Sequence, residues 1–597
     1  MRERQVGTRS NRGVTRRAVL AGVAGAGVLA TTRATTARSA PPPRPAGRTV
    51  AVFGGGMAGL TAAHELAERG FDVTVHEPTA LGGKARSITA PGTGTGGRGD
   101  LPGEHGFRFF PGFYQHIPDT MQRIPVPGNA NGVFDNLVAA GGLRMSIPGG
   151  PDLMSPSPAA PVRLDMYDAT TLQDSLGAMF NLGTAVPPAE MQVFLRKLVM
   201  FLTSSIERRD SEWEHATWAQ TLEADGKSEA YQSVLVSALT RQLVAARPDR
   251  ASTRTIGRIG QAFVLNAAGL VPEYGHLDRL LNGPTNEAWI DPWADLLRGM
   301  GVRFEMGSRV VALDVDGGRI TGATAADAAG NRSRVEADWY VLAVPVERAV
   351  DLLTPQLLAA DPALAGLREL AVDWMVGIQY FLRRPTPIVD GHVAYLGSPW
   401  ALTSISQAQF WPGDFAARYG DGTVHDCLSV DISNWDAPGI LFGKTAKQCT
   451  REEIAKETWA QLRQCLDDGP RPVLRDEDLA HWFLDPGVSW NSALGANTNA
   501  TPLLVNTAGS LRHRPEARTA IGNLFLAGDY VRTDIDLATM ESANESARAA
   551  VNALLDAAGS PAPPCRMYRL HEPPELAPLR AIDAQRHAAG LPHLLAT

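Results

Sequence analysis

A strand, a glycine turn and a helix follow one another near the start of the chain, and no other feature constrains the fold so tightly. An apolar run over residues 50–53 leads into Gly54, Gly56 and Gly59, which occupy the glycine positions of a G-x-G-x-x-G sequence. Gly54 permits a tight turn and Gly56 lets backbone N–H groups approach a pyrophosphate, while Gly59 lets the helix pack closely on the strand. The spacing predicts a dinucleotide-binding βαβ unit and an α/β fold.

The rest of this unit narrows the choice of dinucleotide. Met57 and Ala58 open the predicted helix, whose N-terminus carries the positive end of the helix dipole and favours phosphate. A second strand ends at Glu77, about twenty residues beyond the turn, where a carboxylate accepts hydrogen bonds from ribose hydroxyls and disfavours a 2′-phosphate. The unit alone therefore predicts FAD or NAD rather than NADP.

A second glycine pair favours FAD over NAD. The run from Leu81 to Ser87 places Gly83, Lys84 and Arg86 in a loop that resembles the second dinucleotide signature of the flavin-containing amine oxidase and phytoene desaturase superfamily. Glycine again admits the backbone to a cofactor, and the two cations can neutralise its phosphates. A solvated basic loop is the alternative interpretation. The resemblance implies FAD.

The C-terminal part supplies a matching signature. Residues 523–530 form an apolar strand ending in Gly528 and Asp529, and a small-residue helix begins near Met540. In the resembled superfamily this Asp binds the ribityl-phosphate part of FAD, and the helix start lies beneath the isoalloxazine. We therefore expect Gly528, Asp529, Thr539 and Met540 to contact FAD. Noncovalent attachment is expected because His513 is the only cysteine or histidine between residues 485 and 540.

An aromatic segment, residues 103–114, resembles the segment that passes the flavin in plant-type phytoene and zeta-carotene desaturases. The resemblance implies that its glycines run close to the flavin and its aromatic side chains line a substrate channel. In the alternative interpretation it is a buried aromatic strand whose histidine is satisfied by backbone. His105, Arg108 and Phe110 are candidate catalytic residues by position, and Asp351 is a further candidate base.

The remaining pattern predicts a discontinuous architecture. Residues 302–315, 319–325 and 331–344 alternate like a three-stranded meander, and the resemblance implies that the backbone of Val310 touches adenine. We expect a Rossmann-type, glutathione reductase-like FAD-binding domain with a mixed α+β substrate-binding domain. Long amphipathic runs such as 189–206 and 229–246 predict helices in the latter. The expected parts are a signal peptide (1–40), a proline-rich linker (41–47), the FAD-binding domain (48–150, 281–350 and 501–558), a helical substrate or lid domain (151–280), a second substrate-binding part (351–500) and a C-terminal extension (559–597).

The N-terminus predicts export. Six arginines precede an apolar stretch at residues 18–30, and residues 15–20 resemble a twin-arginine signal. The stretch is shorter than the roughly 20 apolar residues that a membrane-spanning helix needs. We expect an extracellular or periplasmic protein, or one on the outer face of the membrane; a basic extension on a cytoplasmic enzyme is the alternative.

Composition excludes several classes of protein. A 597-residue chain with 44% hydrophobic and 20% charged residues is globular rather than disordered, and its net charge of −7 does not favour nucleic acid. The four cysteines lack C-x-x-C spacing, so neither a zinc site nor an iron–sulfur cluster is indicated. Isolated buried thiols are expected, with one disulfide in an exported protein as the alternative.

Two departures from the amine oxidase pattern favour the desaturase-like branch. No lysine lies near Asp351, and Thr539 stands where an aromatic cage residue is expected. We therefore predict an FAD-dependent oxidoreductase that transfers a hydride from a carbon of a largely apolar small molecule to the flavin. The alternatives are an exported amine or amino-acid oxidase that produces hydrogen peroxide, and a noncatalytic flavin-bound scaffold. Peripheral membrane contact and the oligomeric state stay open.

Overall fold

The fold is described from a computed structural model that covers residues 48–146, 152–156, 164–179, 186–271, 278–466 and 472–596. All of these residues belong to one unit, Pro42–Thr597. The predicted signal peptide and linker, residues 1–47, lie outside the described residues.

The glycine turn follows β1, the central strand of a five-stranded parallel sheet. The glycine turn joins β1 to α1 (Met57–Glu68), which packs alongside α14 (Met540–Ala557) near the end of the chain. Residues 50–53 of β1 are almost fully buried, as expected of a parallel strand that is covered on both faces. The predicted α/β class with a parallel sheet is confirmed. In spatial order the strands are β23 (Leu524–Leu526), β13 (Trp339–Leu342), β1 (Thr49–Phe53), β2 (Asp72–Glu77) and β9 (Arg303–Met306).

The predicted meander is partly wrong. Three strands do form an antiparallel sheet, but the expected ranges 302–315 and 331–344 each divide into two strands. Gly307, with φ +75°, separates β9 from the meander, so that β9 pairs with β2 instead. The second range divides in the same way between the meander and β13 of the parallel sheet. The meander strands are β10 (Arg309–Asp316), β11 (Arg319–Ala326) and β12 (Arg332–Val335).

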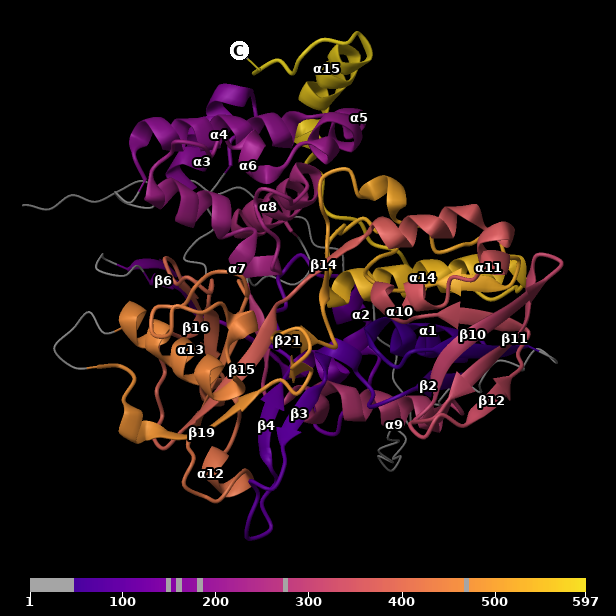
Figure 1. The fold of residues 1–597 in the computed structure, drawn as a ribbon. Helices are drawn as coiled ribbons and strands as arrows, with labels where there is room; N and C mark the ends of the chain where they lie inside the picture. The colour runs from indigo at the N-terminus through magenta and orange to yellow at the C-terminus, as the bar shows by residue number, and fades with distance from the viewer. Residues whose placement is uncertain are drawn as a thin grey trace, which may run out of the picture. The chain divides into compact units, whose positions relative to one another are not determined.

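A seven-stranded mixed sheet forms the second layer of strands. Within this sheet only β6 and β16 pair in parallel, and every other pair of neighbouring strands is antiparallel. Helix α13 (Arg451–Leu466) lies beside this sheet, and its Ala455 carbonyl accepts a hydrogen bond from the Tyr380 hydroxyl at 2.6 Å (Figure 1). In spatial order the strands are β19 (Leu479–Leu484), β15 (Val376–Leu382), β18 (Asp426–Ile432), β17 (Thr403–Ser406), β16 (Gly391–Tyr395), β6 (Gly142–Ser146) and β7 (Leu153–Pro156).

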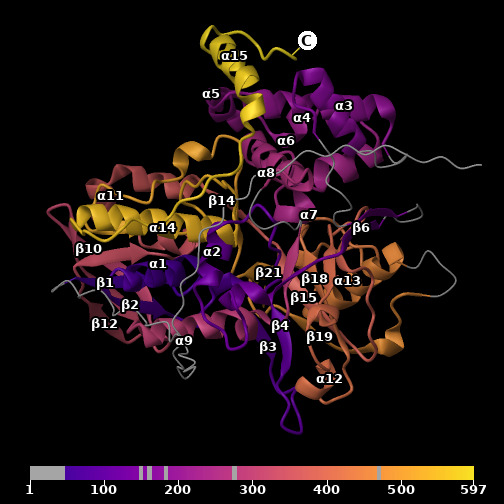
Figure 2. The same cartoon turned by 180° about the vertical axis from the view of Figure 1, so that it is seen from behind.

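A helical group covers the described part of residues 164–271. The expected long run at 229–246 is interrupted: a π-helix, Tyr231–Ser237, is followed by a short α7 (Arg241–Val244), and Ala245 takes a left-handed conformation with φ +57°. The C-terminal α15 (Ala577–Ala588) packs on α4 and α5, as Figure 2 shows. The other helices of the group are α3 (Ala169–Met179), α4 (Pro188–Thr203), α5 (Ile206–Arg208), α6 (Trp218–Thr221) and α8 (Thr253–Ala267).

Short elements connect these layers. The two-stranded sheets pair β3 (Ser87–Ala90) with β4 (Leu101–Glu104), β5 (Leu137–Ala139) with β8 (Arg279–Leu281), β14 (Ala371–Asp373) with β22 (Leu503–Val505), and β20 (Val488–Asn491) with β21 (Ala496–Asn499). The remaining helices are α2 (His116–Gln122), α9 (Asp291–Gly299), α10 (Val346–Asp351), α11 (Pro355–Ala360) and α12 (Phe415–Arg418). All four cysteines are buried and free. None of the described helices is both long enough and apolar enough to span a bilayer.

Candidate cofactor site and substrate compartment

The three turn glycines meet different surroundings. Gly54 has φ +108°, and a Cβ added to it would lie 2.5 Å from the Ala343 carbonyl oxygen. A Cβ on Gly59 would lie 1.8 Å from the Gly54 carbonyl oxygen, so this glycine is required for α1 to pack on β1. Gly56 is open by contrast, because the nearest atom to its added Cβ is the Gly83 Cα at 3.6 Å. Its missing side chain therefore leaves space for a ligand rather than for protein.

The N-terminus of α1 is suited to an anion. Gly56 is the N-cap residue and offers no side-chain cap, and no acidic residue occupies the first turn. Met57 and Ala58 lie at the cavity described below, and the first N–H groups of a helix have no partner within the helix. A diphosphate fits this position because it would accept those hydrogen bonds and complement the helix dipole.

Glu77 ends β2 at the same cavity. Its Oε2 accepts a hydrogen bond from the Gly55 N–H at 2.8 Å, and its Oε1 accepts one from the Thr79 N–H at 2.8 Å. Its Oε1 also accepts a hydrogen bond from the Thr79 hydroxyl at 2.9 Å. A carboxylate has about four lone-pair positions, so about one remains for a ribose hydroxyl. The Glu77 side chain is thus fixed by the turn that it follows and fits the predicted ribose contact.

The basic loop after β2 is part of the cavity wall rather than a solvated loop. Gly83 has φ +57° and approaches Gly56. The Lys84 ammonium contacts the Pro502 carbonyl and lies 3.4 Å from Glu347 Oε1, while Arg86 donates to the Gly83 carbonyl at 2.9 Å. Each cation already has protein partners, and its remaining N–H donors are those available to phosphate, so the expected phosphate contacts of Lys84 and Arg86 stay a prediction.

Arg108 holds the basic loop in place through hydrogen bonds to the loop's backbone. Its guanidinium donates to the carbonyls of Lys84 and Ala85 at 3.0 and 3.1 Å. Burial lowers the pKa of Arg108, an effect that the nearby carboxylates of Glu104 and Asp431 oppose. These bonds give Arg108 a positioning role for the loop.

The start of α14 closes the cavity from the C-terminal side. Gly528, Asp529, Thr539 and Met540 all lie at its wall. The Thr539 hydroxyl oxygen caps α14 by accepting a hydrogen bond from the Ser542 N–H at 3.1 Å. Both sequence signatures, from opposite ends of the chain, therefore meet at one cavity.

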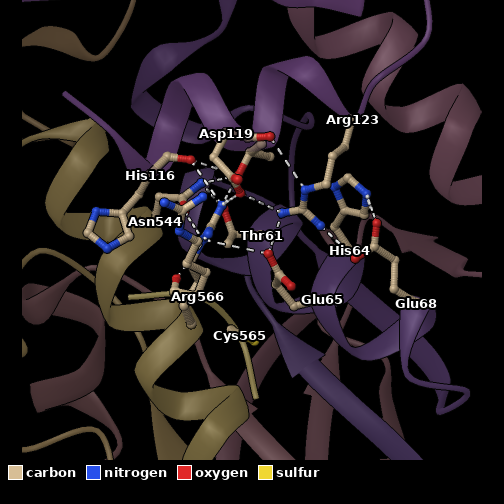
Figure 3. Close-up of polar contacts among 12 residues, drawn as sticks. Thr61, His64, Glu65, Glu68, His116, Asp119, Arg123, Asn544, Cys565 and Arg566 are labelled. Carbon is tan, nitrogen blue, oxygen red and sulfur yellow. Dashed lines mark hydrogen bonds and ion pairs between the residues drawn. The ribbon is translucent and has the colours of Figure 1, made fainter. Parts of the chain in front are cut away.

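Polar contacts lock the helices that reach this cavity. Glu541 accepts hydrogen bonds from the N–H groups of His116 and Ile117 at 2.7 and 2.9 Å, which joins α14 to the start of α2. Burial raises the pKa of Glu541, but the His116 side chain and these N–H groups outweigh that effect and hold it below its usual value. One turn further on, the Asn544 amide donates to the hydroxyl of Thr61 on α1 at 2.9 Å (Figure 3).

The cavity has a volume of about 1050 Å³. It extends from the glycine turn to a chamber, called here the substrate compartment, whose wall includes Phe107, Phe109, Leu143, Met145, Gln242, Phe263, Asp278, His392, Ala394, Thr403 and Asp431. Drug-sized ligand pockets have volumes of about 300–1000 Å³, so the cavity can hold a dinucleotide together with part of a substrate. Val310, the predicted adenine neighbour, also lies at the wall. The described residues contain no cluster of three or more His, Cys, Asp or Glu that could hold a metal ion.

Only part of the aromatic segment lines the compartment. Phe107 and Phe109 lie at the wall, and Phe109 stacks on Phe263 with ring centroids 5.9 Å apart. The expectation that Phe110 lines the channel is wrong. Phe110 is fully buried in the core against Trp289, with ring centroids 5.7 Å apart, because its N–H donates to the Arg279 carbonyl and aligns the segment with β8.

The two candidate bases have very different environments. His105 Nδ1 contacts the Asp485 carboxylate, and its Nε2 is buried without a partner among the described residues. Burial lowers the pKa of His105, and Asp485 opposes this effect. Asp351 ends α10 with its side chain 65% exposed, 3.5 Å from Arg348. Asp351 is therefore a poor proton acceptor for a site that excludes water.

Sequence reasoning missed the polar residues of the compartment. Ala394, Thr403 and Asp431 are direct neighbours across β16, β17 and β18, so they form one row on the sheet. Burial raises the pKa of Asp431 to about 7. His392 lies on β16, and its Nδ1 contacts Asp278. No local sequence signal marks these residues, because sheet pairing brings them together from distant segments.

The fold resembles those of known oxidoreductases, at identities low enough that only the fold is compared. Cyclohexylamine oxidase from Brevibacterium oxydans IH-35A superposes with a TM-score of 0.56 at 15% identity, covering 86% of this chain and all of that chain. Putrescine oxidase bound to putrescine gives 0.52 at 15%, covering 87% and 99%. An oxidoreductase from Methanosarcina mazei gives 0.53 at 12%, covering 84% and 98%.

A family model agrees with the motifs and the cavity. No curated protein matches this chain in sequence. The model for flavin containing amine oxidoreductases, however, matches residues 57–555, which include the N-terminus of α1, the basic loop and almost all of α14. The chain belongs to the family of flavin-containing amine oxidoreductases.

Proposed function

We propose that this FAD-dependent oxidoreductase removes a hydride from a carbon of a largely apolar small molecule. The observation that carries the proposal is the continuity of one cavity from the glycine turn to the substrate compartment. Aromatic and aliphatic side chains form most of the compartment wall, which favours an apolar substrate skeleton. A noncatalytic scaffold would need no such chamber beside its cofactor.

The chain's own residues would bind and orient both partners. The turn around Gly56 and the start of α1 would hold the diphosphate, Glu77 a ribose, and the start of α14 the flavin end. Bound flavin supplies a two-electron acceptor. Phe107, Phe109 and the sheet residues would fix the substrate carbon and keep water away from it. We further propose that FAD is held without a covalent bond.

A desaturase-like reaction follows from the apolar wall and from Thr539 at the start of α14. Its test is anaerobic mixing of the yellow holoenzyme with polyene and polycyclic compounds. Bleaching of the flavin by these compounds, with simple primary amines inert, would support the proposal. A flavin that no compound bleaches would refute hydride transfer and favour the scaffold.

An exported amine or amino-acid oxidase is the second candidate. Two carboxylates in the compartment, Asp278 and Asp431, favour it because a carboxylate can bind an ammonium group. The names of two structurally similar proteins, cyclohexylamine oxidase and putrescine oxidase, suggest the first amines to test. Hydrogen peroxide released from these amines in air, together with rapid anaerobic bleaching, would favour the oxidase over the desaturase-like reaction.

Location and domain limits are further proposals. We propose that residues 1–40 direct twin-arginine export of the folded holoenzyme, followed by a linker at 41–47. The three cofactor-binding parts and the intervening substrate parts are proposed with the limits given above. Small molecules are the proposed partners.

A further inference from the structure

The substrate compartment holds a histidine–carboxylate pair that the proposed function does not use. His392 lies on β16, and its Nδ1 contacts a carboxylate oxygen of Asp278. Each side chain is only 12% exposed. The pair therefore lies in a largely dry part of the cavity wall.

Aromatic rings enclose the imidazole. The ring centroids of Phe107 and Phe109 each lie 5.1 Å from that of His392, with Phe109 meeting it edge-on at 85°. Both phenylalanines line the compartment. This packing fixes the plane of the imidazole and shields it from water.

The contact with Asp278 determines which ring nitrogen carries the proton. An ionised carboxylate can only accept, so Nδ1 is the protonated nitrogen of the neutral imidazole and Nε2 keeps its lone pair. Nε2 is buried and has no hydrogen-bond partner within the described part of the chain. An unpaired buried acceptor is costly, so a group of this kind calls for a partner that binds later.

We propose that His392 is the proton acceptor of the substrate compartment, that Asp278 positions it, and that the oxidised carbon of the substrate bears an N–H or O–H group. This inference rests on the proposed hydride transfer but not on the desaturase-like reaction, because it takes the second hydrogen from N or O rather than from a neighbouring carbon. Bleaching by polyenes with amines and alcohols inert would therefore overturn it while leaving the hydride transfer in place. Because Nε2 is buried, a substrate can reach it only if a neighbouring side chain moves.

The step balances in atoms and electrons. The C–H bond breaks, and its hydrogen and electron pair reduce the flavin. The proton of the N–H or O–H group moves to Nε2, and the electron pair of that bond forms the C=N or C=O bond. Asp278 then faces an imidazolium, whose charge it stabilises.

Asp431 is the rival acceptor in the same compartment. It is buried, lies in the row with Thr403, and faces the Arg108 and Glu104 side chains. Burial raises its pKa to about 7, which suits a proton acceptor. Variants of both residues are therefore needed in the test.

The first measurement does not depend on turnover. In ¹⁵N NMR of histidine-labelled holoenzyme, the His392 signals are those lost in His392→Gln and kept in the control His481→Gln. We expect a bare Nε2 whose resonance shifts with benzylamine or benzyl alcohol but not with toluene, which has the same ring and no N–H or O–H. An Nε2–H tautomer, or identical responses to all three probes, would overturn the proposal.

The second measurement uses whichever substrate bleaches the flavin. The amide of His392→Gln can still donate to Asp278 but cannot take up a proton, so flavin reduction should slow by about 100-fold or more while substrate affinity changes little. Normal reduction in His392→Gln together with loss in Asp431→Asn would assign the role to Asp431 instead. The two measurements can also disagree, if the His392 signal responds to the probes although no substrate reduces the flavin. That result would refute the hydride transfer and with it the proton transfer, and would leave His392 a binding residue.

Discussion

Gly56 and Gly59 lie three residues apart in one turn, yet their substitution should have opposite consequences. The added Cβ of Gly56 finds no protein atom within 3.6 Å, and its φ of −78° suits any L-residue. Gly56→Val should therefore change the unfolding free energy of the flavin-free protein by less than about 1 kcal/mol. Its branched side chain would instead occupy the approach of the diphosphate to the start of α1.

The loss of cofactor affinity follows from the hydrogen bonds at stake. Hydrogen bonds to a charged group contribute about 1.5–3 kcal/mol each, so losing two would cost about 3–6 kcal/mol. That corresponds to a fall in FAD affinity of at least about 100-fold. The purified variant should be folded and colourless.

Gly59→Ala provides the matched contrast. Its Cβ would lie 1.8 Å from a backbone oxygen, so α1 must move away from β1. Overpacking of this kind costs about 1–3 kcal/mol, and more where backbone has to shift. Chemical denaturation of the flavin-free proteins measures the difference, and FAD titration by fluorescence quenching measures affinity. A yellow Gly56→Val protein, or equal denaturation midpoints for the two variants, would refute the reasoning.

Three further predictions concern the compartment, its titration and export. Phe109→Ala should slow flavin bleaching with a modest stability loss, whereas Phe110→Ala should destabilise the fold by about 3–5 kcal/mol, as seen by thermal unfolding, because it empties a core site. Burial raises the pKa of Asp431 and of Glu545 to about 7, so the folded state holds these protons more tightly than the unfolded chain. Their joint contribution to stability should therefore fall as pH rises from about 4 to 7, and Asp431→Asn should remove its part of that contribution; an unchanged slope of stability against pH in this variant would contradict the assignment. Replacing Arg16 and Arg17 with lysine should retain FAD-loaded precursor in the cytoplasm in cell fractionation, and undiminished export would argue against a twin-arginine signal.

Local structure was predictable from the sequence where short-range chemistry determines it. The glycine turn, α1 and the acid at the end of β2 depend on neighbours within thirty residues, and all three appear where the pattern predicts them. The helix start at Met540 follows from its capping threonine for the same reason. These elements place the cofactor end of the cavity.

The substrate end could not be predicted in this way. Strand order brings His392 and Asp431 to the wall of one compartment, since β16, β17 and β18 lie side by side, and Asp278 comes from a segment far upstream. The sequence could not show that Phe110 is buried in the core while Phe109 lines the compartment, because this difference depends on the alignment of the segment with β8. The π-helix at Tyr231–Ser237 likewise breaks a run whose periodicity predicts a continuous helix.

The order of strands in the parallel sheet has a consequence for the time course of biosynthesis. β1 ends at Phe53 and pairs with β13. The next strand of the sheet, β23, pairs with β13 and begins only at Leu524. At ~5–20 residues per second, ribosomes take roughly 25–95 s to make the intervening chain. During that interval α1 has no α14 to pack on, and β13 has no β23 to pair with. Flavin loading therefore belongs to the end of synthesis, and chaperones that shield the nascent N-terminal unit should raise the yield of holoenzyme more than added flavin does.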